Sequence, residues 1–345
     1  MGERLAYGRG GRVAALDGVR ALAIAPVVMV HAFGWPQGGS FGVDVFFVLS
    51  GFLITGLLVS ERESTGSISL RAFYIRRARR LLPALAIMLL VYTAVAAVVG
   101  GLERTLLAVG LTAVYGMNVA VSIDVNHQVI PFGLSHMWSL SAEEQFYLVW
   151  PLLLVFALRR SPRFALGLCS VLFLLASVHQ AGLSGARLVF SPEGRSAVAL
   201  LGGCVAAFLA RSRRVRRVAV LLAPAAVGPI LLAMLLPNPY GWKFLLLVVA
   251  IATLVIGLTG SSALARAFSF RPVVGLGRIS YSLYLWHVPI VTVLAIDLTS
   301  TSRGIAAVVL SMFAAGVSYF VVERRFFARR VLSNVGAPVA IASPA

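Results

Sequence analysis

Residues 41–60 read FGVDVFFVLSGFLITGLLVS, an apolar run in which Asp44 is the one charged residue. A transmembrane helix needs about 20 predominantly apolar residues, so this run is long enough to cross a bilayer. The whole chain shares this character: 59% of its 345 residues are hydrophobic, 12% are charged and the mean hydropathy is +0.93. Ordinary soluble domains carry about 25% charged residues. The composition therefore excludes a soluble enzyme, a disordered chain and a disulfide-rich secreted domain.

Similar apolar runs recur along the chain, between segments that are rich in arginine. They give eleven candidate membrane segments, at residues 13–33, 41–60, 81–100, 103–122, 138–158, 164–181, 195–210, 218–236, 242–260, 279–297 and 304–322. Six basic segments hold 24 of the 30 basic residues, at 4–12, 62–80, 159–163, 211–217, 266–278 and 324–330. Cytoplasmic loops of membrane proteins carry an excess of basic residues, so we expect all six segments, and with them both termini, to be cytoplasmic.

Two termini on one side require an even number of crossings, and eleven is odd. We expect 103–122 to be partial or to lie along the outer face, because Gly100-Gly101 and Glu103-Arg104 flank it. The sequence therefore predicts an all-α polytopic membrane protein with about ten transmembrane helices and both termini cytoplasmic. The expected parts are a cytoplasmic tail at 1–12, a membrane domain at 13–325 and a second cytoplasmic tail at 326–345.

The formal net charge of +18 has two explanations. One is nucleic-acid binding, but the soluble basic face that it requires is missing from this sequence. The other is a membrane protein with cationic loops. We therefore expect contact with membrane lipids and none with nucleic acid.

Ionisable residues within apolar spans are costly, and they usually face a cavity, a partner or a substrate. The first span contains Asp17, Arg20 and His31. The eleven-residue separation of Arg20 and His31 places them within about 20° of one helix face and about 16 Å apart along the axis. The alternative is a salt bridge between Asp17 and Arg20, with His31 at the level of the lipid headgroups.

Two carboxylates are candidates to support a histidine general base. Asp44 is expected at the level of His31, where it would orient the imidazole; alternatively, it is an acid favoured by a helix N-terminus. Glu143 belongs to the segment WSLSAEEQFY at 138–147. Its neighbour Glu144 has the spacing of a capping box with Ser141, whereas Glu143 has no such structural role. His136, in the loop before this segment, is expected to have no function.

Arginines and hydroxyl groups form two further clusters. Residues 73–83 read FYIRRARRLLP, and arginines at this helical spacing suit bidentate binding of phosphates. The alternative is a topology signal that binds anionic lipid. Residues 280–287 read SYSLYLWH, in which Tyr281, Tyr284 and His287 either hydrogen-bond a substrate or pack between helices.

Five motifs, in this order along the chain, resemble those of the acyltransferase 3 family of integral membrane acyltransferases. They are Leu16-Asp17-Gly18-x-Arg20 followed by His31, the run FGVDVFFVLSGF at 41–52, Arg76-x-x-Arg79-Arg80-x-x-Pro83, Trp138-Ser139-Leu140-Ser141-x-Glu143 and the run SYSLYLWH at 280–287. The resemblance extends from residue 16 to about residue 323. It implies a ten-helix fold in the bacterial cytoplasmic membrane that moves an acyl group, usually acetyl, from acyl-CoA to a carbohydrate hydroxyl. We expect the membrane domain to act without the SGNH domain that some members carry.

The resemblance also implies roles for single residues. Arg20 and His31 match the proposed catalytic pair of the family, and Arg76 and Arg79, with Arg80 beside them, match its coenzyme A phosphate contacts. We expect neutral His31 to remove the acceptor proton while Asp44 or Glu143 holds its tautomer; a covalent acyl-histidine is the alternative. The substrate contacts are expected to be Ser139, Tyr281, Tyr284 and His287.

Acyl-CoA is the expected donor, a carbohydrate or glycoside the expected acceptor, and no metal is expected. The rival function is a transporter or flippase of a glycan or an anionic substrate. Many transporters contain inverted repeats, and this sequence shows none. The arginine cluster also fits a phosphate-bearing donor better than a transported glycan.

Overall fold

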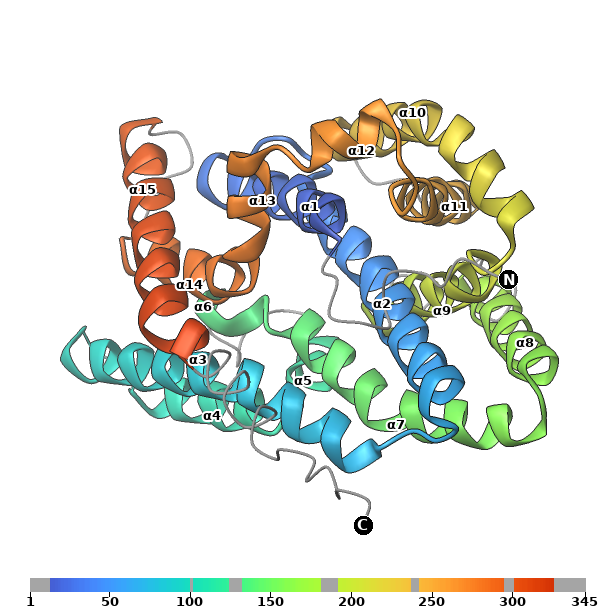
Figure 1. Ribbon diagram of the computed structural model, residues 1–345. Helices are drawn as coiled ribbons and strands as arrows, with labels where there is room; N and C mark the ends of the chain where they lie inside the picture. Colours follow the sequence, from blue (N-terminus) through green and yellow to red (C-terminus); the bar gives the residue numbers. More distant parts are fainter. Residues whose placement is uncertain are drawn as a thin grey trace, which may run out of the picture.

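The computed structural model describes residues 13–99, 102–123, 132–180, 192–236, 242–294 and 301–325, and every element within these ranges is helical (Figure 1). The longer helices are α1 (Ala14–Phe33), α2 (Gly42–Thr65), α3 (Leu70–Val99), α7 (Trp138–Arg160), α8 (Pro162–Gln180), α9 (Pro192–Leu209), α10 (Arg213–Leu235), α11 (Trp242–Gly257), α14 (Ser280–Val293) and α15 (Thr301–Val317). The shorter ones are η2 (Gly39–Phe41), α4 (Leu102–Ala113), α5 (Met117–Ile123), α6 (Phe132–Ser135), α12 (Ala263–Phe268), α13 (Arg271–Arg278) and η3 (Ser318–Glu323). The tails expected at 1–12 and 326–345 lie outside the described residues.

The helices present an apolar outer surface. Among the described residues, six helical stretches are each long and apolar enough to cross a bilayer: Ala14–Phe33, Gly39–Thr65, Leu70–Val98, Pro162–Gln180, Arg213–Leu235 and Thr301–Glu323. Large apolar side chains on these helices point outward, such as Leu90, Leu221 and Phe313, each at least 70% exposed. The all-α polytopic membrane fold is confirmed, whereas the count of ten spans and the side of the termini stay predictions.

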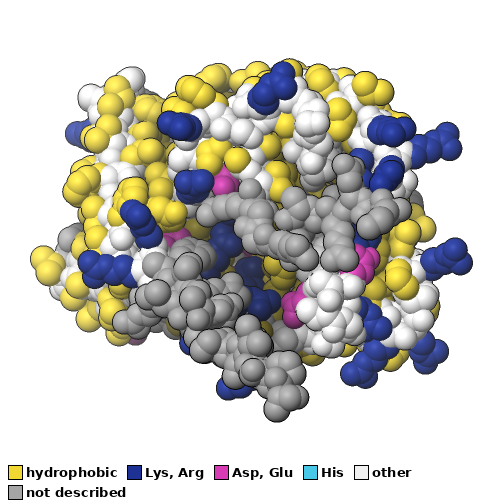
Figure 2. Space-filling model, viewed as in Figure 1, with side chains coloured by type: hydrophobic (Ala, Val, Ile, Leu, Met, Phe, Trp, Pro, Cys, Tyr) yellow, Lys and Arg dark blue, Asp and Glu magenta, His cyan; other side chains and the backbone are white. Residues whose placement is uncertain are grey.

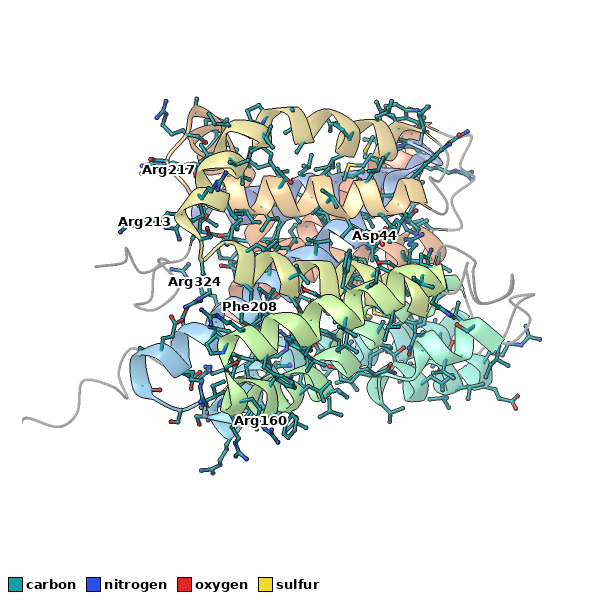
Figure 3. The ribbon with its side chains drawn as sticks, turned by 90° about the vertical axis from the view of Figure 1, so that its right-hand side faces the viewer. Asp44, Arg160, Phe208, Arg213, Arg217 and Arg324 are labelled. Carbon is teal, nitrogen blue, oxygen red and sulfur yellow. The ribbon has the colours of Figure 1, made fainter. Side chains whose placement is uncertain are left out.

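Arginines from distant parts of the chain gather at one end of the helix bundle. In Figure 3 the helices run across the view, and Arg160, Arg213, Arg217 and Arg324 lie at the same end, away from Asp44. We call this the arginine-rich end. Figure 2 looks onto it and shows basic side chains distributed around its rim. The arrangement agrees with the prediction that these basic segments share one side of the membrane.

Two glycines allow α2 and α9 to pack closely against each other. A β-carbon added to Gly51 would lie 2.0 Å from the carbonyl oxygen of Leu200, and one added to Gly203 would lie 2.1 Å from that of Val48. Small residues at such crossings let the backbones of membrane helices approach each other. The contact fixes the rotation of α2, and with it the direction in which Asp44 of α2 points.

The candidate segment 103–122 is broken into α4 and α5. Between these helices, Tyr115 has a left-handed backbone conformation with φ of 55°. The two helices have 12 and 7 residues, and a crossing needs about 20. This break agrees with the prediction that the segment is partial.

Candidate active site

A cavity of about 680 Å³, part of which is continuous with solvent, lies between α1, α2, α3, α7 and α14. Three arginines, two glutamates and six hydroxyl-bearing residues line it: Arg20, Arg77, Arg80, Glu143, Glu144, Ser50, Ser139, Ser280, Tyr147, Tyr281 and Tyr284. Figure 2 shows basic and acidic side chains in a hollow near the middle of the arginine-rich end. Ionisable groups inside a membrane protein usually mark a substrate site. The cavity is therefore the first candidate for substrate binding, and we call it the arginine cavity.

A network of polar side chains holds one wall of the arginine cavity. The Arg77 guanidinium donates from Nη2 to Glu144 Oε1 at 2.6 Å, and its central carbon lies 3.2 Å from the centre of the Tyr147 ring. Glu143 accepts hydrogen bonds from Ser50 of α2 and from Tyr147. The network joins α2, α3 and α7, so it fixes the charged groups of the cavity relative to one another.

Three histidines from different parts of the chain lie close together. The ring centre of His31, on α1, is 5.0 Å from that of His287 on α14. The ring centre of His287 is 5.2 Å from that of His136, which lies between α6 and α7. His287 is fully buried and His136 is 6% exposed. We call these three residues the histidine cluster.

Backbone carbonyl groups determine which nitrogen of each ring carries the proton. His31 Nδ1 lies 2.7 Å from Val27 O, His136 Nε2 lies 3.1 Å from Tyr284 O, and His287 Nδ1 lies 2.8 Å from Tyr284 O. A carbonyl oxygen can only accept, so these nitrogens are the donors. In the neutral rings, the lone pairs then lie on His31 Nε2, His136 Nδ1 and His287 Nε2. An imidazole nitrogen with a lone pair is the group that general-base catalysis requires.

Tyr284 connects the arginine cavity to the histidine cluster. It lines the cavity, and its hydroxyl lies 2.5 Å from Ser139 Oγ and donates to His136 O at 2.7 Å. Its ring centre is 5.3 Å from that of His136 and 5.4 Å from that of His287. Burial, reinforced by the nearby His31, lowers the pKa of His136 to about 3, so this ring is neutral at physiological pH. A cluster of imidazole rings thus lies behind one wall of a cavity lined by arginines.

The carboxylates expected to hold the His31 tautomer have other partners. Asp44 is fully buried and forms an ion pair with Arg195 of α9, with 3.0 Å between Oδ2 and Nη2. A buried carboxylate needs such a cation, and the close packing of α2 against α9 supplies it. Glu143 is bonded to α2 and to a neighbour on its own helix. The carbonyl of Val27, one turn earlier on α1, contacts Nδ1 of His31, and a catalytic role for Asp44 or Glu143 stays a prediction.

Helix α3 turns a different row of arginines toward the cavity from the row in the sequence motif. Arg76 pairs with Glu61 at 3.5 Å, and Arg79 is exposed. Arg77 and Arg80 line the cavity instead. Residues three apart share a helix face, so the two pairs form separate rows, and the contacts of α3 with α7 turn the second row inward. Arg77 and Arg80 therefore face the cavity, whereas Arg76 and Arg79 do not line it, and the role expected for Arg76 and Arg79 at the coenzyme A phosphates stays a prediction.

The remaining predicted residues lie in or beside the arginine cavity. Arg20, Ser139, Tyr281 and Tyr284 line it, and the Tyr281 hydroxyl donates to a backbone carbonyl of α3 at 3.0 Å. The salt bridge considered for Asp17 and Arg20 is present at 3.8 Å. His287 lies behind Tyr284, in the histidine cluster.

Sequence reasoning missed His136 and misread Glu144. The one signal for His136 was its position two residues before the Trp138 motif. Glu144 does not cap α7, because it pairs with Arg77, and the Ser141 hydroxyl accepts from a backbone N–H of α5 at 3.3 Å. Within the described ranges, no group of three or more His, Cys, Asp or Glu side chains could hold a metal ion.

Comparison with known proteins identifies relatives of this chain. The family model described as an acyltransferase domain matches residues 13–323. The chain is 34% identical to the peptidoglycan O-acetyltransferase OatA of Listeria monocytogenes over 344 residues, which cover 90% of this chain and 55% of the relative. It is 33% identical to the O-acetyltransferase OatA of Staphylococcus aureus (strain NCTC 8325) over 303 residues, covering 80% of this chain and 50% of that one. The chain thus spans about half the length of these relatives, and no solved structure matches it. The chain belongs to the acyltransferase 3 family that its motifs indicated.

Proposed function

We propose that the protein is a membrane O-acetyltransferase that moves an acetyl group from acetyl-CoA to a hydroxyl of a cell-envelope glycan. The observation that carries the proposal is the connection, through Ser139 and Tyr284, between the arginine cavity and the histidine cluster. Both relatives are named O-acetyltransferases, which supports the reaction class, and the name of the Listeria protein supports peptidoglycan as the acceptor.

In this proposal the arginine cavity binds the donor. Coenzyme A carries several phosphate groups, and guanidinium groups bind phosphates through paired, charge-assisted hydrogen bonds. Arg20, Arg77 and Arg80 provide three such groups on two helices. The two glutamates of the cavity offset part of this charge, and Glu144 holds Arg77 in a fixed direction. The nucleotide part of acetyl-CoA then lies toward the arginine-rich end, and the thioester of acetyl-CoA is directed toward Tyr284.

His31 is the proposed general base. It lies in the last turn of α1, which a short connection joins to the end of α2 that carries Asp44, remote from the arginine-rich end in Figure 3. The glycan therefore approaches from the opposite end to the donor. His31 Nε2 takes the proton of the glycan hydroxyl while the oxygen of that hydroxyl attacks the thioester carbonyl of acetyl-CoA. The new C–O bond forms, the C–S bond breaks, and the coenzyme A thiolate receives the proton.

His31→Asn tests this function. The asparagine amide N–H can replace Nδ1 as donor to the Val27 carbonyl, whereas the Nε2 lone pair is lost. Purified protein in liposomes is incubated with acetyl-CoA that carries a labelled acetyl group and with peptidoglycan fragments. The assay measures both the acetylated glycan and the free coenzyme A. We expect transfer to fall by about 10²–10⁴-fold, the usual contribution of a general base.

The matched control is His179→Asn, on α8 and outside the histidine cluster, which should retain wild-type transfer. Near-normal transfer by the His31 variant would contradict the proposed role of His31. Movement of the glycan across the liposome membrane without release of coenzyme A would instead identify a transporter.

A further inference from the structure

A second hollow lies between the helices that face the viewer in Figure 3. It has a volume of about 940 Å³, part of which is open to the outside, between α9, α10 and α11, and Phe173 of α8 also lines it. Of the described residues that line it, all are apolar except Thr253 and Arg214. It shares no lining residue with the arginine cavity, so the two spaces are separate. We call this hollow the lateral groove.

Small side chains on three helices create the lateral groove: Gly202, Ala206, Ala219 and Ala252. Leu209, Leu222 and Val249 also line it, and they are 40%, 52% and 56% exposed. The groove therefore opens outward on helices whose surface is apolar. In a membrane protein such a surface faces hydrocarbon rather than water, so acyl chains are the chemistry that fits the groove.

Four of the five arginines at residues 211–217, around the start of α10, divide into two groups. Arg211 pairs with Glu63 of α2, and Arg216 donates to a backbone carbonyl at 3.0 Å, so both serve contacts within the protein. Arg214 lines the groove and is exposed. Arg217 is one turn further along α10, is also exposed, and lies at the arginine-rich end in Figure 3. The apolar groove thus has cations at the end where lipid headgroups would lie.

We infer that the lateral groove binds one molecule of an anionic phospholipid. One acyl chain lies along Ala206 and Ala252, and the phosphate lies at Arg214 and Arg217. The apolar lining selects hydrocarbon, and the two cations favour a headgroup with net negative charge over one that carries its own cation. The site lies outside the proposed route of acetyl transfer, so the inference is independent of the proposed function.

Native mass spectrometry of the protein released from nanodiscs tests this site. The nanodiscs contain phosphatidylcholine and a minor fraction of phosphatidylglycerol, and the measurement is the phosphatidylglycerol retained as collision energy rises. We expect the wild type to retain one molecule. Arg214→Gln/Arg217→Gln should weaken retention by about 30-fold, because each basic residue at the membrane surface contributes about fivefold in affinity. The control is Arg159→Gln/Arg160→Gln, an exposed pair on α7 that does not line the groove.

Ala252→Leu tests the groove without changing its charge. Ala252 is partly exposed, so the larger side chain can fill the groove and leave the core intact, which gel filtration and thermal unfolding would check. We expect the variant to lose phosphatidylglycerol while it keeps both arginines. If the double variants of both arginine pairs lost phosphatidylglycerol equally, the proposal would be overturned, because the lipid would then be attracted to the whole basic end rather than to the groove. Unchanged retention in Ala252→Leu would overturn it too, as would a dimer whose second copy covers the groove.

Discussion

Each ring of the histidine cluster donates one N–H to a backbone carbonyl and keeps a lone pair on its other nitrogen. For His31 the acceptor is Val27 O, in the preceding turn of the same helix. A carbonyl fixes the tautomer of an imidazole as a carboxylate does, but it adds no full negative charge beside the ring. The cluster can therefore stay neutral and oriented at the same time, as a base in an apolar environment needs to be.

Arg80 and Arg79 are adjacent in the sequence, and they should differ in their effect on the donor. Arg80 lines the arginine cavity and Arg79 is exposed. A hydrogen bond to a charged group is worth about 1.5–3 kcal/mol, so Arg80→Gln should raise the KM for acetyl-CoA by about 10- to 100-fold and leave kcat nearly unchanged. Arg79→Gln is the matched control and should leave KM within about twofold, as expected at a surface site. Steady-state kinetics at varied acetyl-CoA checks this, and a larger effect from Arg79 would restore the assignment made from the motif.

Residue types were easier to predict than residue directions. The sequence marked α3 as a source of phosphate-binding arginines, but the row that faces inward depends on contacts with α7, such as that of Arg77 with Glu144. The same holds for His136, which belongs to the histidine cluster because it contacts Tyr284 and His287, about 150 residues further along the chain. Spacing within one helix describes that helix alone, and it carries no information about what lies opposite.

At the scale of elements, the close packing of α2 against α9 requires glycine at position 51, and this requirement can be tested by substitution. A methyl group at Gly51 would meet the Leu200 carbonyl oxygen, whereas one at Gly56, on the same helix, would find no atom within 4 Å. Overpacking a close contact costs about 1–3 kcal/mol, and alanine is otherwise favoured over glycine within a helix by about 1 kcal/mol. We expect Gly51→Ala to lower the unfolding temperature of the protein in detergent, and Gly56→Ala to maintain or raise it. Equal unfolding temperatures for the two variants would show that the helices do not approach this closely.

Apolar run length predicted where most helices lie, because it measures the one property that the bilayer selects. The even number of crossings and the residues that flank 103–122 marked this segment as partial, and the left-handed Tyr115 shows how the chain breaks there. Apolar run length could not predict which helices pack against each other. The ion pair of Asp44 with Arg195 joins α2 to α9 through two residues that are 151 positions apart in the sequence. A hydropathy profile is read along one dimension, so it cannot show which faces of two distant helices meet.

For the whole molecule, the arginine-rich end predicts the orientation in the membrane. Trp35 follows α1 and is 57% exposed, whereas Arg217 lies at the arginine-rich end. Cys169 and Cys204 are both fully buried, so the unmodified protein should react little with a membrane-impermeant maleimide. We expect Trp35→Cys to react in right-side-out vesicles and Arg217→Cys in inverted ones, since basic loops stay cytoplasmic. Reaction of both variants in the same vesicles would contradict this orientation.

The position of Tyr284 has a consequence for the membrane itself. An enzyme that joins a donor on one side to an acceptor on the other must not become a pore for water or ions. Tyr284 contacts the arginine cavity on one side and the histidines on the other, and its hydroxyl and carbonyl oxygen are both engaged in hydrogen bonds. In this conformation the Tyr284 side chain stands between the arginine cavity and the histidine cluster, so the bundle is closed at this point and the proposed transfer requires Tyr284 to move aside.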